Sequence, residues 1–380
     1  MRALIVHPTQ ARATIAASRA LAKAGWTVGT GSPERNFISA SRASRYWHHV
    51  PAALEDVDAF LEATRAAVVK GGYELVFGGH DAEALALSAH RDELGAEVAH
   101  PPHERMVRAF DKLHLGSAAR AAGLATPRTV SGDDPEVDLV VKPRIYESSK
   151  PEVQIFSDPV AAARRVAELT EAGVEHVVQE RVRGQLMALV VVADRDSNVV
   201  ARVQQRACRI WPPEAGTSAR AETVPTDEEL AERVSRLLRA LGWSGLVQLQ
   251  FLAPEGGAPV LIDFNGRFYG SLALGVAAGV NLPAIWAAVA TGGPLPPNRE
   301  AASGVRYQWL EGDLRRAYAE RRGGLARDVA GSLRYAFGAA HNTSSVADPL
   351  PTLRLAASNL TASTRFRTRA ARRRLRRSAR

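Results

Sequence analysis

Oxygen-bearing side chains gather at the ends of two short apolar runs between Leu246 and Phe264. A Gly/Pro-rich turn joins the runs, which predicts a β-hairpin. Gln250 ends the first run, and Asp263 and Asn265 are two residues apart in the second, so both point to one side of a strand. Arg267 follows at once. Carboxylate and amide oxygens beside a cation are what a magnesium ion carrying phosphates requires, so the segment predicts a magnesium–triphosphate site.

A known family shares this pattern. The run Asp263-Phe264-Asn265-Gly266-Arg267 resembles the last strand of the ATP-grasp superfamily, which reads roughly Glu-x-Asn-Pro-Arg after a strand with an acidic or amide ligand. Gln250 takes the place of that ligand, as an amide does in carbamoyl-phosphate synthetases. Asp263 is one methylene shorter than the usual glutamate, and Gly266 makes the turn less rigid than proline would. The alternative interpretation is an ordinary buried hairpin with a polar end, and the specificity of the pattern disfavours it.

Composition sets the class of protein. The chain has 380 residues, of which 46% are hydrophobic and 23% charged, typical of a soluble globular protein with two or three domains. No apolar run reaches the ~18 residues of a membrane span, and the first residues predict a strand rather than a signal peptide. The single cysteine, Cys208, excludes an internal disulfide framework, and we expect it to be a small buried residue. These features predict a cytoplasmic protein.

The net charge of +9 comes from the end of the chain. Residues 365–380 hold nine arginines and no acid, which leaves 40 basic and 40 acidic residues in the rest. Such a block is typical of a solvated extension. It could also contact an anionic membrane surface, at the inner face of a cell membrane, or RNA. Phe366 is its only aromatic residue, so base stacking is unsupported and we favour the membrane over nucleic acid.

The N-terminal part alternates strands and helices, which predicts an α/β domain with a parallel, Rossmann-like sheet. The predicted strands lie near residues 2–6, 27–31 and 74–77, and helices near 11–24 and 56–70. The first strand is followed by His7-Pro8-Thr9-Gln10, without the glycine fingerprint of dinucleotide-binding proteins. A nicotinamide oxidoreductase is therefore weakly supported.

The resemblance extends to the nucleotide-binding half. Asp111-Lys112 opens a helix, and Lys142 ends an apolar strand, where the family places a phosphate-binding lysine. A surface lysine is the alternative. The family's next loop is glycine-rich, whereas residues 144–151 contain no glycine, which makes close backbone approach to phosphate harder.

A second strand end resembles the family's hinge near residues 180–184, where adenine binds. The resemblance implies that Glu180 and Val182 flank adenine, that Gln179 beside them also binds the cofactor, and that Gln185 is the candidate contact for ribose. A plain core strand is the alternative. It further implies that a basic residue downstream touches the transferred phosphoryl group and the carboxylate; Arg209 is the first choice and Arg206 the second. Residues 214–220 are expected to form a flexible loop at the mouth of the site.

The resemblance implies an ATP-grasp fold in four segments. These are a pre-ATP-grasp α/β domain (1–110), an ATP-grasp domain of two subdomains (111–295), a largely helical C-terminal extension (296–364) and the arginine-rich tail (365–380). The chain resembles short carboxylate–amine ligases related to biotin carboxylase and to the carbamoyl-phosphate synthetase large subunit. Specific motifs cover residues 1 to 300 only.

The implied activity is an ADP-forming ligase that uses ATP and Mg²⁺, with Mn²⁺ as a possible substitute. It activates a small-molecule carboxylate as an acyl phosphate, which an amine then attacks. Gln250, Asp263 and Asn265 would bind the metal, with Arg267 and Arg209 on the reacting groups. Two alternatives stay open. One is a bicarbonate- or carbamate-activating enzyme; the other is an inactive ATP-binding scaffold, which the glycine-free loop favours.

Overall fold

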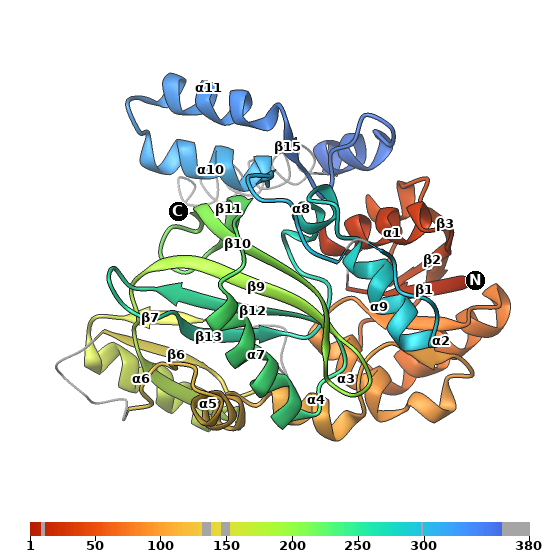
Figure 1. Cartoon of the computed structure of the whole chain (residues 1–380), viewed down its shortest axis with the longest axis horizontal. Coiled ribbons are helices and arrows are strands. Elements are labelled where there is room, and N and C mark those ends of the chain that lie inside the picture. Colours follow the sequence, from red (N-terminus) through yellow and green to blue (C-terminus); the bar gives the residue numbers. More distant parts are fainter. Residues whose placement is uncertain (9–11, 131–137, 146–152, 298, 359–380) are drawn as a thin grey trace, which may run out of the picture.

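The computed structural model describes residues 1–8, 12–130, 138–145, 153–297 and 299–358, and these contain three β-sheets flanked by helices (Figure 1). The mixed α/β class predicted from the sequence is confirmed. Within the described ranges, no helix is both long and apolar enough to cross a membrane. The arginine-rich tail (365–380) and most of the glycine-free loop lie outside these residues.

The N-terminal sheet has five strands in the order β3-β2-β1-β4-β5, all parallel. The strands are β1 (Arg2–Val6), β2 (Thr27–Ser32), β3 (Ser44–His49), β4 (Leu75–Gly78) and β5 (Glu97–Val98). After its first residue β1 is entirely buried, as expected of a central strand covered on both faces. The chain winds outward in opposite directions from β1 and β4, so a crevice opens at their carboxyl ends. The sequence did not predict β3.

Two further sheets follow. The three-stranded sheet contains β6 (Leu139–Pro143), β7 (Gln154–Phe156) and β8 (His176–Glu180) in the order β7-β6-β8. The seven-stranded sheet has the order β13-β12-β9-β10-β11-β14-β15. Its strands are β9 (Gln185–Ala193), β10 (Val199–Trp211), β11 (Thr217–Thr223), β12 (Gly245–Ala253), β13 (Val260–Asn265), β14 (Arg306–Gln308) and β15 (Ala339–Ala340). Because β14 and β15 belong to it, the segment after residue 296 shares a sheet with the central part of the chain.

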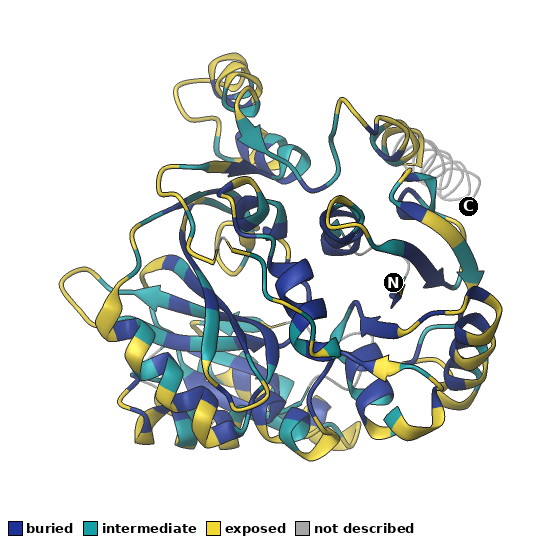
Figure 2. Ribbon diagram, turned by 45° about the vertical axis from the view of Figure 1, so that its right-hand side comes forward, coloured by how far each residue is buried: buried dark blue, intermediate teal, exposed yellow. Residues whose placement is uncertain are grey.

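The helices begin at side chains that satisfy their free N–H groups. Asp56, Asp111 and Asp227 each accept a hydrogen bond from the first turn of α2, α5 and α7. The helices are α1 (Arg12–Lys23), α2 (Val57–Gly71), α3 (Asp81–Ala89), α4 (His103–Phe110), α5 (Lys112–Ala121), α6 (Pro159–Glu171), α7 (Glu228–Leu241), α8 (Leu272–Ala277), α9 (Leu282–Thr291), α10 (Leu310–Glu320) and α11 (Leu325–Ala336). Most present one buried and one exposed face (Figure 2).

One hydrophobic core joins the N-terminal sheet to the rest of the molecule. Phe77 of β4 packs against Phe268, which follows β13, and against Trp286 of α9, with ring centroids 5.3 and 4.8 Å away. All three side chains are fully or almost fully buried. Trp286 also donates a hydrogen bond from its indole nitrogen to the carbonyl of Ala99. The end of β13 is thereby fixed against the carboxyl edge of the N-terminal sheet.

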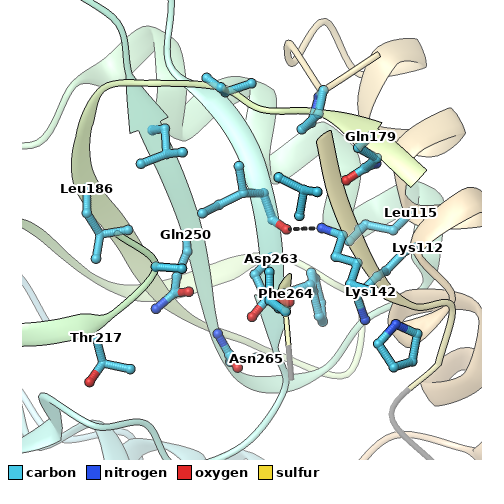
Figure 3. Close-up of a pocket in the computed structure, with 18 of the residues that line it drawn as sticks. Lys112, Leu115, Lys142, Gln179, Leu186, Thr217, Gln250, Asp263, Phe264 and Asn265 are labelled. Carbon is cyan, nitrogen blue, oxygen red and sulfur yellow. Dashed lines mark hydrogen bonds between the residues drawn. The ribbon is translucent and has the colours of Figure 1, made fainter. Parts of the chain in front are cut away.

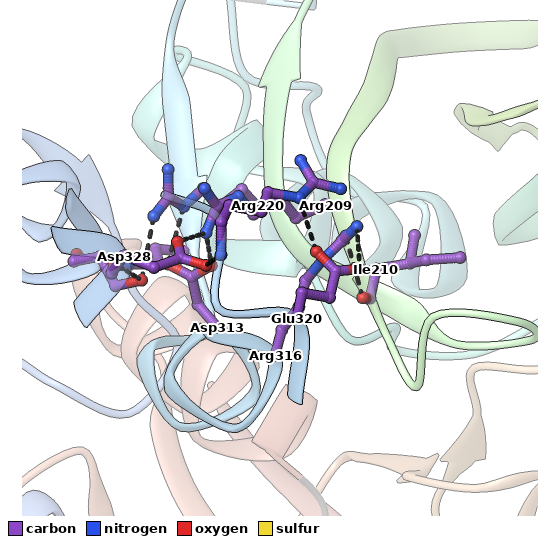
Figure 4. A network of polar contacts seen from close by, with 10 residues as sticks. Arg209, Ile210, Arg220, Asp313, Arg316, Glu320 and Asp328 are labelled. Carbon is purple, nitrogen blue, oxygen red and sulfur yellow. Dashed lines mark hydrogen bonds and ion pairs between the residues drawn. The ribbon is translucent and has the colours of Figure 1, made fainter. Parts of the chain in front are cut away.

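A buried ionic network attaches the two C-terminal helices to the seven-stranded sheet (Figure 4). Asp313 of α10 is fully buried and accepts hydrogen bonds from Arg209 of β10 (3.3 Å) and Arg220 of β11 (2.7 Å). Arg209 also contacts Asp328 of α11 at 3.0 Å. A fourth contact, from Arg316 Nη1 to the carbonyl of Ile210, measures 3.2 Å. The C-terminal end of β10 is thus bound by side chains of α10 and α11.

Two local expectations are wrong. Cys208 is exposed rather than buried, because it lies two residues after Arg206 on β10 and shares that residue's solvent-facing side. Residues 214–220 do not form a continuous loop, since Thr217 begins strand β11 and pairs with Trp211. The turn between β10 and β11 is therefore short.

Replacing Asp313 with alanine tests the ionic network. The substitution leaves two arginines buried without their shared counter-ion, so we expect the free energy of unfolding to fall by about 3–5 kcal/mol. The measurement is a chemical denaturation curve. Glu255→Ala, in the exposed turn between β12 and β13, is the control and is expected to change stability little. An Asp313→Ala protein as stable as the wild type would contradict this role.

Candidate active site

A cavity of about 440 Å³ lies between the three-stranded and the seven-stranded sheets (Figure 3). This volume suits a bound small molecule. Its walls come from β6, β7 and β8 on one side and from β9, β10, β12 and β13 on the other, and α3 and α5 contribute at one end. Polar lining residues gather at that end: His80, Asp81, Lys112, Lys142, Gln250, Asp263, Asn265 and Arg267.

The hairpin of β12 and β13 brings the predicted metal ligands together. Its antiparallel register pairs Gln250 with Asp263 and Gln248 with Asn265. Side chains of directly paired residues lie on the same face of the sheet, so four oxygen-bearing groups share one surface. Gln250 donates a hydrogen bond to Gln248 (3.3 Å), and within the described residues no hydrogen bond to the Asp263 carboxylate is seen. The carboxylate lines the cavity beside the amide groups of Gln250 and Asn265 (Figure 3).

Lys142 enters this polar end from the opposite sheet. Its side chain is 6% exposed, and the ammonium donates a hydrogen bond to the carbonyl of Ile262 at 3.0 Å (Figure 3). Burial lowers the pKa of Lys142 to about 8, with Asp263 acting in the opposite direction and Lys112 in the same one. The group is still mainly charged at pH 7, and its positive charge is poorly solvated. Such a site favours a bound anion.

Arg267 is positioned by an ion pair with Asp81. Its Nε lies 2.8 Å from Asp81 Oδ1, and its Nη2 donates to Asn265 Oδ1 at 3.0 Å. Burial alone would raise the pKa of Asp81, but Arg267, with smaller contributions from His80 and Lys112, lowers it overall. Burial and Arg267 lower the pKa of His80 to about 4, so this imidazole is neutral at pH 7. The cations at this end are therefore arginine and lysine.

The other end of the cavity combines aliphatic walls with polar residues at and after the end of β8. Gln179, Glu180, Arg181 and Val182 line it in sequence. Aliphatic side chains from both sheets form its walls: Val140, Ile155, Leu186, Ile210, Leu252 and Ile262. Arg181 forms an ion pair with Glu214 of the β10–β11 turn, which also lines the cavity. A slot with aliphatic walls and a polar rim therefore leads into an end that carries both signs of charge.

Known proteins share parts of this arrangement. Residues 173–313 match the family described as ATP-grasp in the biosynthetic pathway with Ter operon. No curated protein matches the sequence at a significant level. The matched segment contains β12, β13 and Arg267, that is, the polar end of the cavity on the side of the seven-stranded sheet.

Solved structures extend the likeness over most of the chain. Biotin carboxylase from Campylobacter jejuni, in complex with β-γ-ATP, superposes with a TM-score of 0.63 at 15% identity over 80% of this chain and 74% of that one. The L-amino acid ligase from Bacillus licheniformis gives 0.59 at 17% identity over 76% and 74%. N5-carboxyaminoimidazole synthetase from Staphylococcus aureus, complexed with ADP, gives 0.59 at 12% identity over 80% of each chain.

The chain has the ATP-grasp fold. At these identities the likeness concerns the fold alone. The predicted ATP-grasp fold, with its N-terminal parallel sheet, is thereby confirmed.

Most of the predicted site residues line the cavity of this ATP-grasp fold, and two do not. Gln185 lies outside the lining and donates a hydrogen bond to the carbonyl of Ala207, at 3.4 Å, so the geometry gives no support to its predicted ribose contact. Arg209 also lies outside. The register shifts on both sides of it, and its guanidinium binds Asp313 and Asp328, while its neighbour Ile210 lines the cavity. The reserve candidate, Arg206, pairs with Glu222 at the surface.

The sequence did not give the roles of three groups at or beside the polar end. Lys112 was noted only as the start of a helix, and it lines the polar end. Gln248 was overlooked although its spacing from Gln250 places both on one strand face. Asp81 is separated from Arg267 by 186 positions, so no local pattern pairs them. Hairpin register would have revealed Gln248.

Titration of Lys142 predicts a pH dependence of nucleotide binding. A neutral amine attracts phosphate less than an ammonium, and the bound phosphates raise the pKa, so the proton is retained in the complex. Above a pH of about 8 the dissociation constant of Mg·ATP should therefore rise, by up to about tenfold per pH unit. Calorimetric titrations between pH 7 and 9.5 measure it, and Lys142→Met should bind weakly with no such rise. A flat profile in the wild type would contradict this role.

Proposed function

We propose that this protein is an ADP-forming carboxylate–amine ligase. The single observation that carries the proposal is the cavity, in which a slot with aliphatic walls beside a strand end leads to oxygen ligands and cations. That order matches the order of chemical groups in ATP: a planar base, a ribose and a charged triphosphate. The ATP-grasp fold and its likeness to an L-amino acid ligase structure support the same activity.

The donor set fits a magnesium ion. Asp263 supplies a carboxylate, and Gln250 and Asn265 supply amide oxygens, all hard ligands of the type that Mg²⁺ prefers. No group of three or more His, Cys, Asp or Glu side chains able to hold a metal occurs in the part of the chain that the structure describes. The remaining ligands of an octahedral ion would come from phosphate oxygens and water. Bound there, the ion would neutralise charge on the phosphates.

The residues that line the cavity indicate which end would hold the adenine ring of ATP and which end the phosphates. The adenine ring would lie in the aliphatic slot, where the backbone at Glu180 and Val182 offers hydrogen-bonding groups at the rim. Lys142 and Lys112 would contact phosphate oxygens as point charges. Among the described lining residues, Arg267 is the one arginine of the polar end. Its ion pair with Asp81 fixes the orientation of its guanidinium group. It is therefore the candidate catalytic residue.

The proposed reaction has two steps. A carboxylate oxygen of the substrate attacks the γ-phosphorus of ATP, the bond from that phosphorus to the β–γ bridging oxygen breaks, and ADP leaves. The resulting acyl phosphate is attacked at its carbonyl carbon by an amine, which loses a proton as inorganic phosphate departs. Arg267 would bind the carboxylate and then the transferred phosphoryl group. The protein contributes orientation and charge stabilisation rather than a covalent nucleophile.

Binding of Mg·ATP is the first test. At about 100 times its dissociation constant, a ligand that binds only the native state stabilises it by about 2.7 kcal/mol. We expect a magnesium-dependent rise in the thermal unfolding midpoint for the wild type and for Glu255→Gln, an acid-to-amide control in the exposed turn of the same hairpin. Asp263→Asn should lose the rise. No rise in a folded wild-type protein would contradict the proposal.

Product formation tests the reaction itself. ADP release should require Mg²⁺, a carboxylate and an amine together, and should be lost in Arg267→Ala. Release that needs bicarbonate in place of an added carboxylate would assign the carboxylating alternative instead. Binding without ADP release across a broad set of acid and amine pairs would favour an ATP-binding scaffold.

A further inference from the structure

Helix α11 packs on the molecule through one face only. Asp328 and Ser332, one turn apart, are buried and reach toward β10 and β11, where Arg209 and Arg220 bind them at 3.0 and 3.1 Å. The opposite face carries no other described element and is exposed to solvent (Figures 1 and 2). The ionic network therefore fixes which face of α11 points outward.

The outward face is apolar where a solvated helix would be polar. Ala326, Ala330, Leu333 and Phe337 follow one another at spacings of three or four residues, so they form a stripe along one side of the helix. Leu333 is 47% exposed and Phe337 81%. The stripe is flanked by arginines on the same side of the helix, Arg327 and Arg334. An apolar stripe bordered by arginines is the pattern of a helix that lies in the interface of a membrane.

A shallow hollow opens beside this stripe. Arg306, Gly331, Arg334, Tyr335 and Phe337 line it. The Arg306 guanidinium lies over the Tyr335 ring, 5.2 Å from its centroid, and its Nη2 donates to the carbonyl of Phe337 at 3.4 Å. Two guanidinium groups thus face a recess with aromatic walls. This chemistry suits a phosphate headgroup with the start of its acyl chains.

The exposed charges on α11 itself are of one sign. The single acid of α11, Asp328, is buried and bound by Arg209. On α10, Glu311 pairs with Arg315 and Glu320 pairs with Arg316. Within the described part of α11, no side-chain hydrogen bond or ion pair is seen for Arg327 or Arg334. The outward face therefore presents positive charge that the protein itself does not neutralise.

We propose that the outward face of α11 docks on an anionic lipid bilayer, with Leu333 and Phe337 entering the headgroup region and the flanking arginines binding lipid phosphates. An amphipathic helix or a basic segment alone binds a membrane weakly, and stable attachment generally requires two such elements. The nine arginines of residues 365–380 are a second membrane-binding element in this chain. The proposal does not depend on the ligase activity, because the face lies outside the cavity.

Vesicle flotation with the full-length protein tests this proposal. The wild type should float with vesicles of phosphatidylcholine and phosphatidylglycerol, not with phosphatidylcholine alone. Phe337→Ser should weaken binding roughly tenfold through lost apolar burial. The pair Arg327→Glu and Arg334→Glu should weaken it roughly 30-fold or more through lost attraction.

Control variants distinguish a specific role of the outward face of α11 from the effects of losing any exposed apolar side chain or of changing the net charge. Val69, on α2, is also 81% exposed, so Val69→Ser controls for Phe337→Ser. Arg108→Glu with Arg239→Glu, on the exposed sides of α4 and α7, makes the same change in net charge. Both controls should float as the wild type does, and all variants should bind Mg·ATP equally.

Three results would overturn the proposal. Wild-type flotation by both α11 variants would show that this face is not the docking surface. A dimer in light scattering that Phe337→Ser dissociates, with flotation unchanged, would assign the face to a second copy of the chain. Binding of single-stranded RNA that needs the arginines but not Phe337, without vesicle binding, would assign it to nucleic acid.

Discussion

The site depends on one contact between parts of the chain that are far apart in sequence, the ion pair of Asp81 with Arg267. An ion pair with little exposure gains little net stability, because desolvation offsets the attraction. Its geometry here is imposed by the aromatic contact beneath it, in which Phe77, Phe268 and Trp286 bury their rings against one another. Burial of these rings supplies the free energy, and the ion pair uses the resulting rigidity to direct a guanidinium into the cavity.

The two sheets around the cavity divide the chemistry between them. The β12–β13 hairpin brings its oxygen ligands to one face by register alone, without long loops. The three-stranded sheet contributes Lys142, whose ammonium reaches across to the carbonyl of Ile262 and so links the sheets at the polar end. Movement of one sheet against the other would therefore change both the volume of the cavity and the environment of this lysine.

Residue patterns within a few positions of each other predicted the parts of the site that neighbouring residues determine. Alternation along a strand and hairpin pairing placed Gln250, Asp263 and Asn265 together, and the ATP-grasp resemblance was carried by five consecutive residues of this hairpin. The structure places Arg209 outside the cavity lining, because its partners, Asp313 and Asp328, lie more than 100 positions away and bind its guanidinium there. Asp81 was not paired with Arg267 for the same reason. The exposure of Cys208 could have been predicted, because Cys208 lies two residues after Arg206 on the same strand and therefore on the same face.

The most direct measurement is the position of a metal ion in crystals grown with Mn²⁺ and a non-hydrolysable ATP analogue. Anomalous scattering locates Mn²⁺ independently of the surrounding density. We expect a peak bonded to oxygens of Asp263 and Asn265 and to phosphate oxygens of a nucleotide whose base lies beside Glu180 and Val182. A nucleotide bound elsewhere, or a metal that contacts none of the hairpin ligands, would contradict it.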